Sequence, residues 1–191
     1  MQVLSQRDDG VRILRISSQA EADPWRASFA GSYQAIWQEP PYNERYFPEE
    51  AEAVLRHNLE VPENITLLAV RDSGLVVGFA FGYPVVAKVD VCREVRGLLP
   101  VEDVFYFAEL GVLERWRAGG LGHQLVDLRL SLIDRNRYPY VLLRTSAVRN
   151  ASYEMYRRMG FDDTGVYMEV ASRKTDGGTR TDRRLFLSKV V

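Results

Sequence analysis

The residues that could do chemistry gather in one stretch, 103–126, which reads DVFYFAELGVLERWRAGGLGHQLV. Its second half contains an arginine and three glycines, in the order Arg117-Ala118-Gly119-Gly120-Leu121-Gly122. Glycine lets backbone N–H groups approach a ligand because no Cβ is in the way. The first N–H groups of a helix have no partner within it, and the helix dipole adds about half a positive charge there. A loop of this kind at a helix start can bind phosphate or pyrophosphate, and a tight turn without a ligand is the alternative.

A strand and a helix are expected on either side of these glycines. Residues 104–113 are apolar apart from Glu109, which is typical of a strand buried on both faces of a sheet. Beyond the glycines, leucines recur at the spacing of one helical face, at Leu121, Leu125, Leu128 and Leu132. The sequence therefore predicts a strand, a glycine loop, and a helix that starts at the glycines and ends near Asn136.

The glycine spacing argues against two other phosphate-binding motifs. A mononucleotide P-loop needs Lys followed by Ser or Thr after its last glycine, whereas His123-Gln124 follows Gly122 here. A dinucleotide fingerprint places three glycines in a wider frame, with an acidic residue about twenty positions later. The spacing from Arg117 is instead Arg-x-x-Gly-x-Gly, so a nucleotide-dependent enzyme is the weaker alternative.

Length and composition indicate one domain, residues 1–191, that folds without disulfides or metal. The formal net charge is −1, which argues against a nucleic-acid-binding protein. The chain has one cysteine and two histidines, so neither an internal disulfide nor a structural zinc site is expected. No apolar run is long enough to span a membrane and the N-terminus lacks a signal-peptide pattern, so we expect a soluble, cytoplasmic protein.

The remaining chain predicts short alternating elements of an α/β protein. Expected strands cover residues 11–16, 65–71, 75–86, 140–145, 165–171 and 184–190. Expected helices cover residues 17–38, 48 to about 59, and a stretch between a cap at Asn150 and a stop at Gly160. Residues 88–102 are expected to form a loop, and the polar segment 172–182 a mobile connection.

A second motif lies in the last of these helices. Residues 150–161, NASYEMYRRMGF, contain Asn150 followed by Tyr156-x-x-x-Gly160-Phe161. The two motifs in this order resemble those of the GNAT superfamily of acetyl-CoA-dependent N-acetyltransferases, and the similar stretch covers roughly residues 65–170. The resemblance implies a mixed central sheet of about six to seven strands flanked by helices, with a splayed strand pair that holds acyl-CoA.

The resemblance also implies which residues bind acetyl-CoA. The strand residues Leu110, Gly111 and Val112 would pair with the pantetheine arm. The pyrophosphate would be held by the loop and the first helical turn, namely Arg117, Ala118, Gly119, Gly120, Leu121, Gly122 and His123. Asn150 would contact the cofactor near the pantetheine, and Tyr156 would lie beside the thioester sulfur.

Acetyl transfer to an amine requires a neutral nitrogen and a proton for the departing thiolate. Deprotonating an alkylammonium of pKa about 10.4 at pH 7 costs about 4.6 kcal/mol, so a general base matters. Glu109 is the candidate base because burial would raise its pKa, and pairing with an arginine is the alternative. Tyr156 is the candidate general acid, with an ordinary core tyrosine as the alternative. Tyr33, Trp37 and Tyr42 are candidates for the acceptor pocket, unless they are plain core aromatics.

We therefore expect an acetyl-CoA-dependent N-acetyltransferase that transfers directly in a ternary complex, without a covalent enzyme intermediate. The expected acceptor is a primary amine of a small molecule, for instance an amino sugar or an aminoglycoside-like compound. Acetylation of a protein or peptide N-terminus is the second alternative, and a CoA-binding sensor without turnover is an alternative of another class. A homodimer through the C-terminal strands is compatible with the sequence, and no nucleic-acid or membrane partner is expected.

Overall fold

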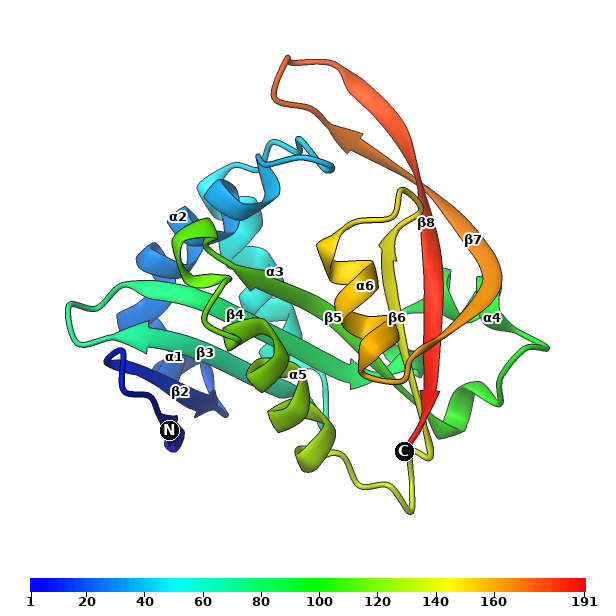
Figure 1. The fold of residues 1–191 in the computed structure, drawn as a ribbon, viewed down its shortest axis with the longest axis horizontal. Helices are drawn as coiled ribbons and strands as arrows, with labels where there is room; N and C mark the ends of the chain where they lie inside the picture. The colour runs from blue at the N-terminus through cyan, green and yellow to red at the C-terminus, as the bar shows by residue number, and fades with distance from the viewer.

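The fold is one mixed sheet of eight strands with helices on both faces, seen in a computed structural model that describes residues 1–191 (Figure 1). The strand order is β1-β2-β3-β4-β5-β6-β8-β7. The strands are β1 (Gln2–Gln6), β2 (Val11–Ile16), β3 (Ile65–Arg71), β4 (Val76–Pro84), β5 (Val104–Val112), β6 (Tyr140–Ser146), β7 (Asp162–Arg173) and β8 (Thr179–Val190). The helices are α1 (Gln19–Ala22), α2 (Arg26–Trp37), α3 (Pro48–Glu60), α4 (Val89–Val95), α5 (Leu121–Leu132) and α6 (Ala151–Arg158).

The two faces of the sheet bury separate cores. Helices α5 and α6 lie on one face, and α2 and α3 lie on the other (Figure 1). On the first face Leu125 and Val126 of α5 join the core cluster that contains Phe107 of β5. On the second face Phe29 of α2 packs against Phe79 of β4, with their ring centroids 5.1 Å apart. The sheet thus separates two compartments, and the mixed α/β fold expected from the sequence is confirmed.

One pair of neighbouring strands does not stay together. Strands β5 and β6 run parallel, and residues 104–107 of β5 pair with residues 140–143 of β6. Beyond that point the strands part, while β5 continues to pair with β4 as far as Val112. On the β4 side, the register shifts between Phe81, opposite Glu109, and Tyr83, opposite Tyr106, so β5 has one residue more than β4 there. Such a bulge bends a strand, and here it lies where β5 leaves β6.

Several elements differ from the sequence prediction for local reasons. The expected helix 17–38 is interrupted by a 3-10 turn at Asp23–Trp25, because Pro24 cannot donate the backbone hydrogen bond of a continuous helix. Residues 88–102 are not only loop, since Val91 and Val95 lie one turn apart on the buried side of α4. Strand β1 was not predicted, and the helix after the glycines ends at Leu132 rather than near Asn136. The sheet has eight strands instead of six or seven.

The segment 172–182 is structured as well. Strands β7 and β8 extend into it from both sides and form a long hairpin, whose tip lies beside the loop that connects α2 and α3 (Figure 1). The prediction of a mobile connection at 172–182 is therefore wrong, because cross-strand hydrogen bonds organise its ends.

None of the helices is long and apolar enough to cross a membrane.

Candidate active site

The glycine loop presents a row of free backbone N–H groups. Helix α5 begins at Leu121, after Gly120 adopts a left-handed conformation with φ of 76°. The amides of residues 118–123 donate no hydrogen bond to any protein group. A left-handed residue at a helix start turns consecutive N–H groups toward the same space, which favours an anion there. The loop therefore has the donors that a pyrophosphate needs.

The loop is held from the N-terminal side of the chain. The Arg7 guanidinium donates to the carbonyl oxygen of Gly119 at 2.7 Å and to the Gln124 side chain at 2.8 Å. The Gln124 amide in turn donates to the hydroxyl of Ser5 at 2.8 Å. The unpredicted strand β1 and the turn after it thus fix the position of the glycine loop.

Arg117 connects the loop to two other segments. Its Nε donates to the carbonyl oxygen of Val112, the last residue of β5, at 2.8 Å. Its guanidinium also forms an ion pair with Glu39, which lies in the connection between α2 and α3. The arginine is partly exposed, so this ion pair can exchange for a phosphate at small cost.

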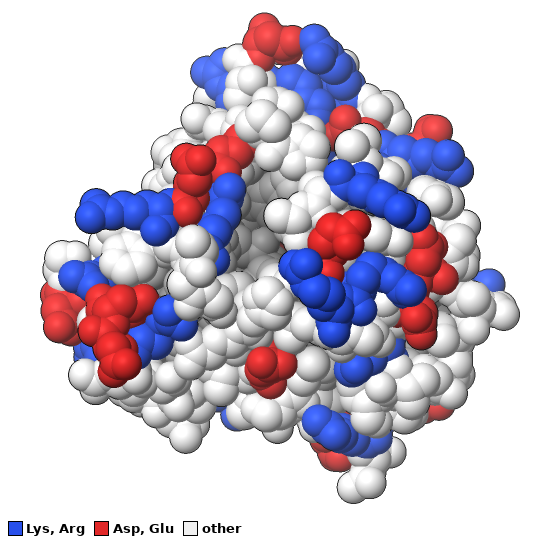
Figure 2. All heavy atoms as spheres, in the orientation of Figure 1, with Lys and Arg blue, Asp and Glu red and all other residues white.

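A cavity of about 340 Å³ opens between the glycine loop, the end of β5, the α2–α3 connection and the start of α6. We call it the glycine-loop cavity. Figure 2 shows the hollow on the face that carries α5 and α6. The predicted residues that line it are Trp37, Tyr42, Leu110, Gly111, Val112, Arg117, Gly122, His123 and Asn150. Ala118, Gly119 and Gly120 lie in the same loop just outside this lining, and Leu121 is buried in the core.

Two of these residues also have a structural reason to be present. A Cβ at Gly111 would lie 2.4 Å from the ring of Phe79, so only glycine allows β5 to pack this closely. The Asn150 side chain accepts a hydrogen bond from the Tyr153 amide at 2.9 Å and caps helix α6. The cap uses the Asn150 oxygen and leaves its NH2 group without a protein partner, in a residue that lines the cavity.

A second cavity, of about 300 Å³, lies on the face of the sheet that α3 covers. We call it the Glu109 cavity. Side chains from α3, β4, β5 and β6 line it, among them His57, Tyr83, Tyr106, Glu109 and Arg144. Glu109 lies at the bulge in β5, directly before the residues that line the glycine-loop cavity. The linings of the two cavities therefore adjoin in β5, at the consecutive residues Glu109 and Leu110, where this strand parts from β6.

The environment of Glu109 changes its acidity. Glu109 lines a cavity, and part of its surface is exposed. The surrounding protein nevertheless removes most of the water that would hydrate its carboxylate. This burial raises the pKa of Glu109 to about 7, although the nearby Arg144 acts in the opposite direction. Glu109 has no ion-pair partner within 4.0 Å. A carboxyl group with this pKa can accept a proton at neutral pH.

Tyr156 lies in α6 and is 5% exposed, with its ring 5.3 Å from that of Phe161. Burial raises the pKa of its hydroxyl, and the neighbouring Arg129 guanidinium opposes this increase. The phenol therefore keeps its proton at neutral pH. Tyr156 is not in the lining of either cavity, so its predicted place beside a thioester stays a prediction.

Arg129 is a residue that the sequence analysis missed. It is fully buried on α5, and its Nη1 donates to the carbonyl oxygens of Phe81 and Glu109, each at 3.0 Å. Its guanidinium lies 3.9 Å from the ring centroid of Phe107, and Nε and Nη2 have no protein acceptor. Arg129 thus holds the backbones of both β4 and β5 at the bulge, from the face of the sheet that α5 covers. A signal was available, because Arg129 lies four residues after Leu125 on the buried helical face.

The three predicted acceptor-pocket aromatics do not lie together in the Glu109 cavity. Tyr33 is 2% exposed and packs in the core, with its ring 5.4 Å from that of Phe79, so it lines neither cavity. The rings of Trp37 and Tyr42 contact each other, with their centroids 4.7 Å apart, and both residues line the glycine-loop cavity instead. Of the two cavities, α2 reaches only the glycine-loop cavity, through Ile36 and Trp37, and the helix that lines the Glu109 cavity is α3.

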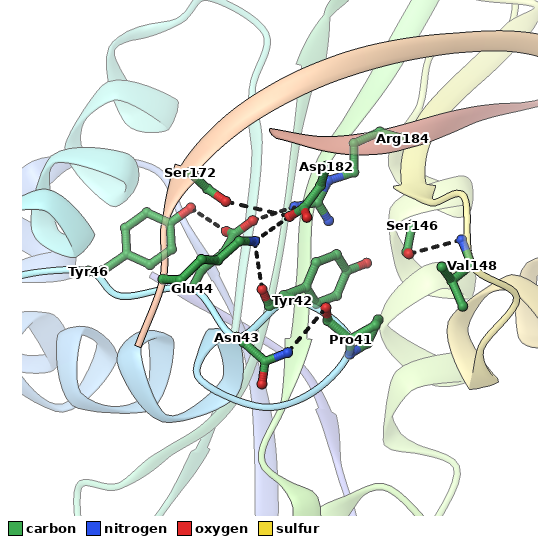
Figure 3. A network of polar contacts seen from close by, with 11 residues as sticks. Pro41, Tyr42, Asn43, Glu44, Tyr46, Ser146, Val148, Ser172, Asp182 and Arg184 are labelled. Atoms are coloured by element: carbon green, nitrogen blue, oxygen red, sulfur yellow. Dashed lines mark hydrogen bonds and ion pairs between the residues drawn. The ribbon is translucent and has the colours of Figure 1, made fainter. Parts of the chain in front are cut away.

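The α2–α3 connection, residues 38–47, is joined to the β7–β8 hairpin by a polar network (Figure 3). A buried ion pair links Glu44 to Arg184, and the Tyr46 hydroxyl donates to Glu44 at 2.9 Å. Lys174 donates to the carbonyl oxygen of Tyr42 at 2.8 Å and pairs with Asp182. Backbone hydrogen bonds Arg45 to Arg173 and Thr175 to Asn43 complete the junction, at 2.9 and 3.0 Å. The connection is thereby held across the end of the parted strands.

A known family has the same organisation. The model of the acetyltransferase (GNAT) family matches residues 24–161, which is most of the chain. The chain belongs to the GNAT acetyltransferase family. Acetyltransferases of this family use acetyl-CoA as acyl donor, so the chain is an acyl-CoA-dependent transferase. No curated protein sequence matches the chain.

Solved GNAT structures have a similar fold. A GCN5-related N-acetyltransferase from Kribbella flavida superposes with a TM-score of 0.62 at 16% identity, covering 97% of this chain and 100% of that one. A ribosomal-protein-alanine N-acetyltransferase from Brucella melitensis superposes with a TM-score of 0.61 at 20% identity, covering 94% of this chain and 99% of that one. A chain of the NatC complex bound to Gag peptide and CoA superposes with a TM-score of 0.59 at 16% identity, covering 94% of this chain and 98% of that one. The structural similarity establishes the fold, and sequence identities this low leave the acceptor open.

Proposed function

We propose that this acetyltransferase moves the acetyl group of acetyl-CoA directly to a primary amine of a small molecule, in a ternary complex. The observation that carries this proposal is the pair of cavities whose linings adjoin in β5, where it parts from β6. One cavity offers free backbone amides, and the other offers a carboxyl group of raised pKa. Two reactants can therefore approach the same point from the two faces of the sheet.

The chain fits acetyl-CoA in two respects. Residues 118–123 have the unpaired N–H groups that a pyrophosphate requires, with Arg117 beside them. Residues 110–112 of β5 have lost β6 as a partner and can pair with an amide-containing arm. Bound acetyl-CoA would supply an activated thioester, at which the acceptor nitrogen forms a C–N bond while the C–S bond breaks. We assign the amide side of Asn150 to the same arm.

Glu109 would take the proton that the amine loses. Its pKa of about 7 makes the carboxylate available at neutral pH and brings it closer to the pKa of the amine than an ordinary glutamate is. The carbonyl of the same residue is fixed by Arg129 at 3.0 Å, so the backbone that carries the base cannot easily rotate. A base held in this way needs little reorganisation before proton transfer.

Tyr156 would return a proton to the sulfur that leaves. Its pKa is raised by burial, so the phenol is protonated when it is needed. Proton donation also requires that the phenolate formed is tolerated in a dry environment, which burial alone would oppose. The neighbouring Arg129 cation lowers that cost, because it favours the charged form of the phenol. Glu109 and Tyr156 thus act on the two faces of β5 with one arginine between them.

The size of the acceptor side favours a small molecule. The Glu109 cavity is about 300 Å³, at the lower end of the range for small-ligand sites. A peptide N-terminus is the second candidate, because fold relatives include a ribosomal-protein-alanine N-acetyltransferase and a complex bound to a peptide.

A thiol-release assay tests the proposal. Purified protein is incubated with acetyl-CoA and panels of small primary amines and of peptides with free N-termini, and CoA thiol and acetylated product are both measured. We expect acetylated product only from the small amines, in amounts equal to the thiol released. Acetylation of peptides alone would favour the second candidate. Tight CoA binding without any acetylated product would instead indicate a sensor that binds CoA without turnover.

A further inference from the structure

The Glu109 cavity contains two charged groups of opposite sign that the protein leaves without an ion-pair partner. Glu109 and Arg144 both line it, and both are only partly exposed. Neither takes part in any ion pair within 4.0 Å, including one with the other. The one hydrogen bond of the Arg144 guanidinium goes to the sulfur of Met168 at 3.1 Å, and a thioether is a weak acceptor.

The other charges around this cavity are already engaged. Glu50 pairs with Arg173 at 3.2 Å, outside the cavity, and Lys88 pairs with Asp90 at 3.4 Å. The nearby Glu44 has a buried ion pair of its own in the junction with the β7–β8 hairpin. What remains for a ligand is therefore one cation and one acid. Charged groups withdrawn from water are normally paired, so an arginine left free beside a cavity points to an anionic ligand group.

From this arrangement we propose that the acceptor is an amine that also carries a carboxylate, of the size of a single amino acid. The inference rests on the proposed transfer to a small amine and names its substrate class. The carboxylate is bound by the guanidinium of Arg144, and the amine faces Glu109. The planar guanidinium can hold both carboxylate oxygens at once, which a lysine in its place could not do.

The position of Arg144 in the strand supports this orientation. Leu143 is the last β6 residue paired with β5, so Arg144 is the first residue beyond the parting, opposite the bulge that carries Glu109. An amine and a carboxylate on one carbon can therefore contact Glu109 and Arg144 together at the place where the linings of the two cavities adjoin. An aminoglycoside-like acceptor fits less well, because it would bring several ammonium groups to a cavity that holds a free arginine.

Matched ligand pairs test the inference. Each L-amino acid of a panel is compared with its primary amide and with the decarboxylated amine, all with wild-type protein loaded with CoA or acetyl-CoA. Binding to the CoA-loaded protein is measured by calorimetry, and acetylation by thiol release. We expect amino acids to bind about 10- to 100-fold more tightly than their amides, as for a charge-assisted bidentate contact. The amine of an amide is the weaker base, so an enzyme indifferent to the carboxylate would acetylate the amide faster.

Variants assign the effect to Arg144. Arg144→Gln is expected to remove the preference for the carboxylate, raising KM for amino acids about 10- to 100-fold and changing kcat/KM for amides less than about threefold. Arg144→Lys, which keeps the charge in the sheet, should retain part of the preference. Arg93→Gln is the matched control, because Arg93 is exposed on α4 and has no ion-pair partner.

The results separate this inference from the proposed function. Equal binding of amino acids and amides, or equal loss of both in Arg144→Gln, would overturn the inference even if amines are acetylated. Preferred binding of amino acids that is lost in Arg144→Gln would support it even if turnover is slow. Absence of acetylated product from every compound would refute the proposed transfer to a small amine, and the calorimetric comparison would still decide whether the cavity recognises a carboxylate.

Discussion

The two cavities differ in what they are made of. The glycine-loop cavity combines a backbone frame, formed by the end of β5, the glycine loop and the cap of α6, with side chains of the α2–α3 connection. The Glu109 cavity is built from side chains that α3, β4, β5 and β6 contribute from distant parts of the sequence. Backbone groups are the same in every protein, so the first suits a ligand common to a family. Side chains can be exchanged without moving the backbone, so the second suits a ligand that differs between members.

The largest separation of the two sides is expected from Glu109→Gln. We expect kcat/KM for the amine to fall by about 100- to 10,000-fold, because a general base is lost, with CoA affinity unchanged. In the wild type, activity should rise as the pH increases through about 7, where the Glu109 carboxyl loses its proton, and the variant should lack this step. Rate measurements across pH test the loss of the base, and calorimetry tests whether CoA affinity is unchanged. Glu102→Gln, at an exposed position, is the control.

Tyr156→Phe is expected to have the next largest effect. We expect kcat to fall about 100-fold because the general acid is lost, and CoA affinity to change little because the ring still packs against Phe161. Tyr153→Phe is the matched control, since Tyr153 is a similarly buried tyrosine in the same helix. Equal losses in the two variants, measured as steady-state kcat, would mean that Tyr156 is a packing residue.

Gly120→Ala should affect only the glycine-loop side. No atom lies within 4 Å of the added Cβ, so the cost comes from the left-handed backbone alone and the loop is expected to relax. We expect CoA affinity to fall about 5- to 30-fold, with the ratio of rates for different amines unchanged. Gly74→Ala has the same strain in the β3–β4 turn and should leave CoA affinity intact. Calorimetry with CoA compares the two, and a change in amine selectivity would contradict the separation of the cavities.

Arg117→Ala is expected to give the smallest effect. The side chain is partly exposed and pairs with Glu39, so its net gain with a phosphate is small and screened by salt. We expect KM for acetyl-CoA to rise about threefold at low ionic strength and less at high ionic strength. Arg115→Ala, two residues away and exposed, should change neither value. An effect that does not depend on salt would point instead to the hydrogen bond between Arg117 and Val112.

The glycine-loop side could be predicted because its parts are close in the sequence. Strand, loop and helix lie within residues 104–132, and the helix cap at Asn150 follows a recognisable pattern. Periodicity and glycine spacing are local signals, so they identify such a unit without knowledge of the rest of the fold. The support that Arg7 gives to Gly119 was not predicted, because the two residues are separated by 112 positions.

The Glu109 side could not be predicted in the same way. Glu109 was singled out because it interrupts an apolar strand, but nothing in the sequence places Arg144 or His57 beside it. Tyr33 packs in the core, which is the alternative that the sequence left open, because an aromatic residue on an amphipathic helix gives the same pattern whether it faces the core or a cavity. The chemical roles of Glu109, Tyr156 and the cofactor-binding residues stay predictions that the variants above can test.

The parting of β5 from β6 would give each reactant of the proposed ternary complex a cavity of its own. The glycine-loop cavity opens on the face of α5 and α6, and the Glu109 cavity lies on the face of α3. With acetyl-CoA in the glycine-loop cavity and the acceptor in the Glu109 cavity, as proposed, neither would have to travel past the other, so we expect the two to load in either order and the acetylated product to depart while CoA is still bound.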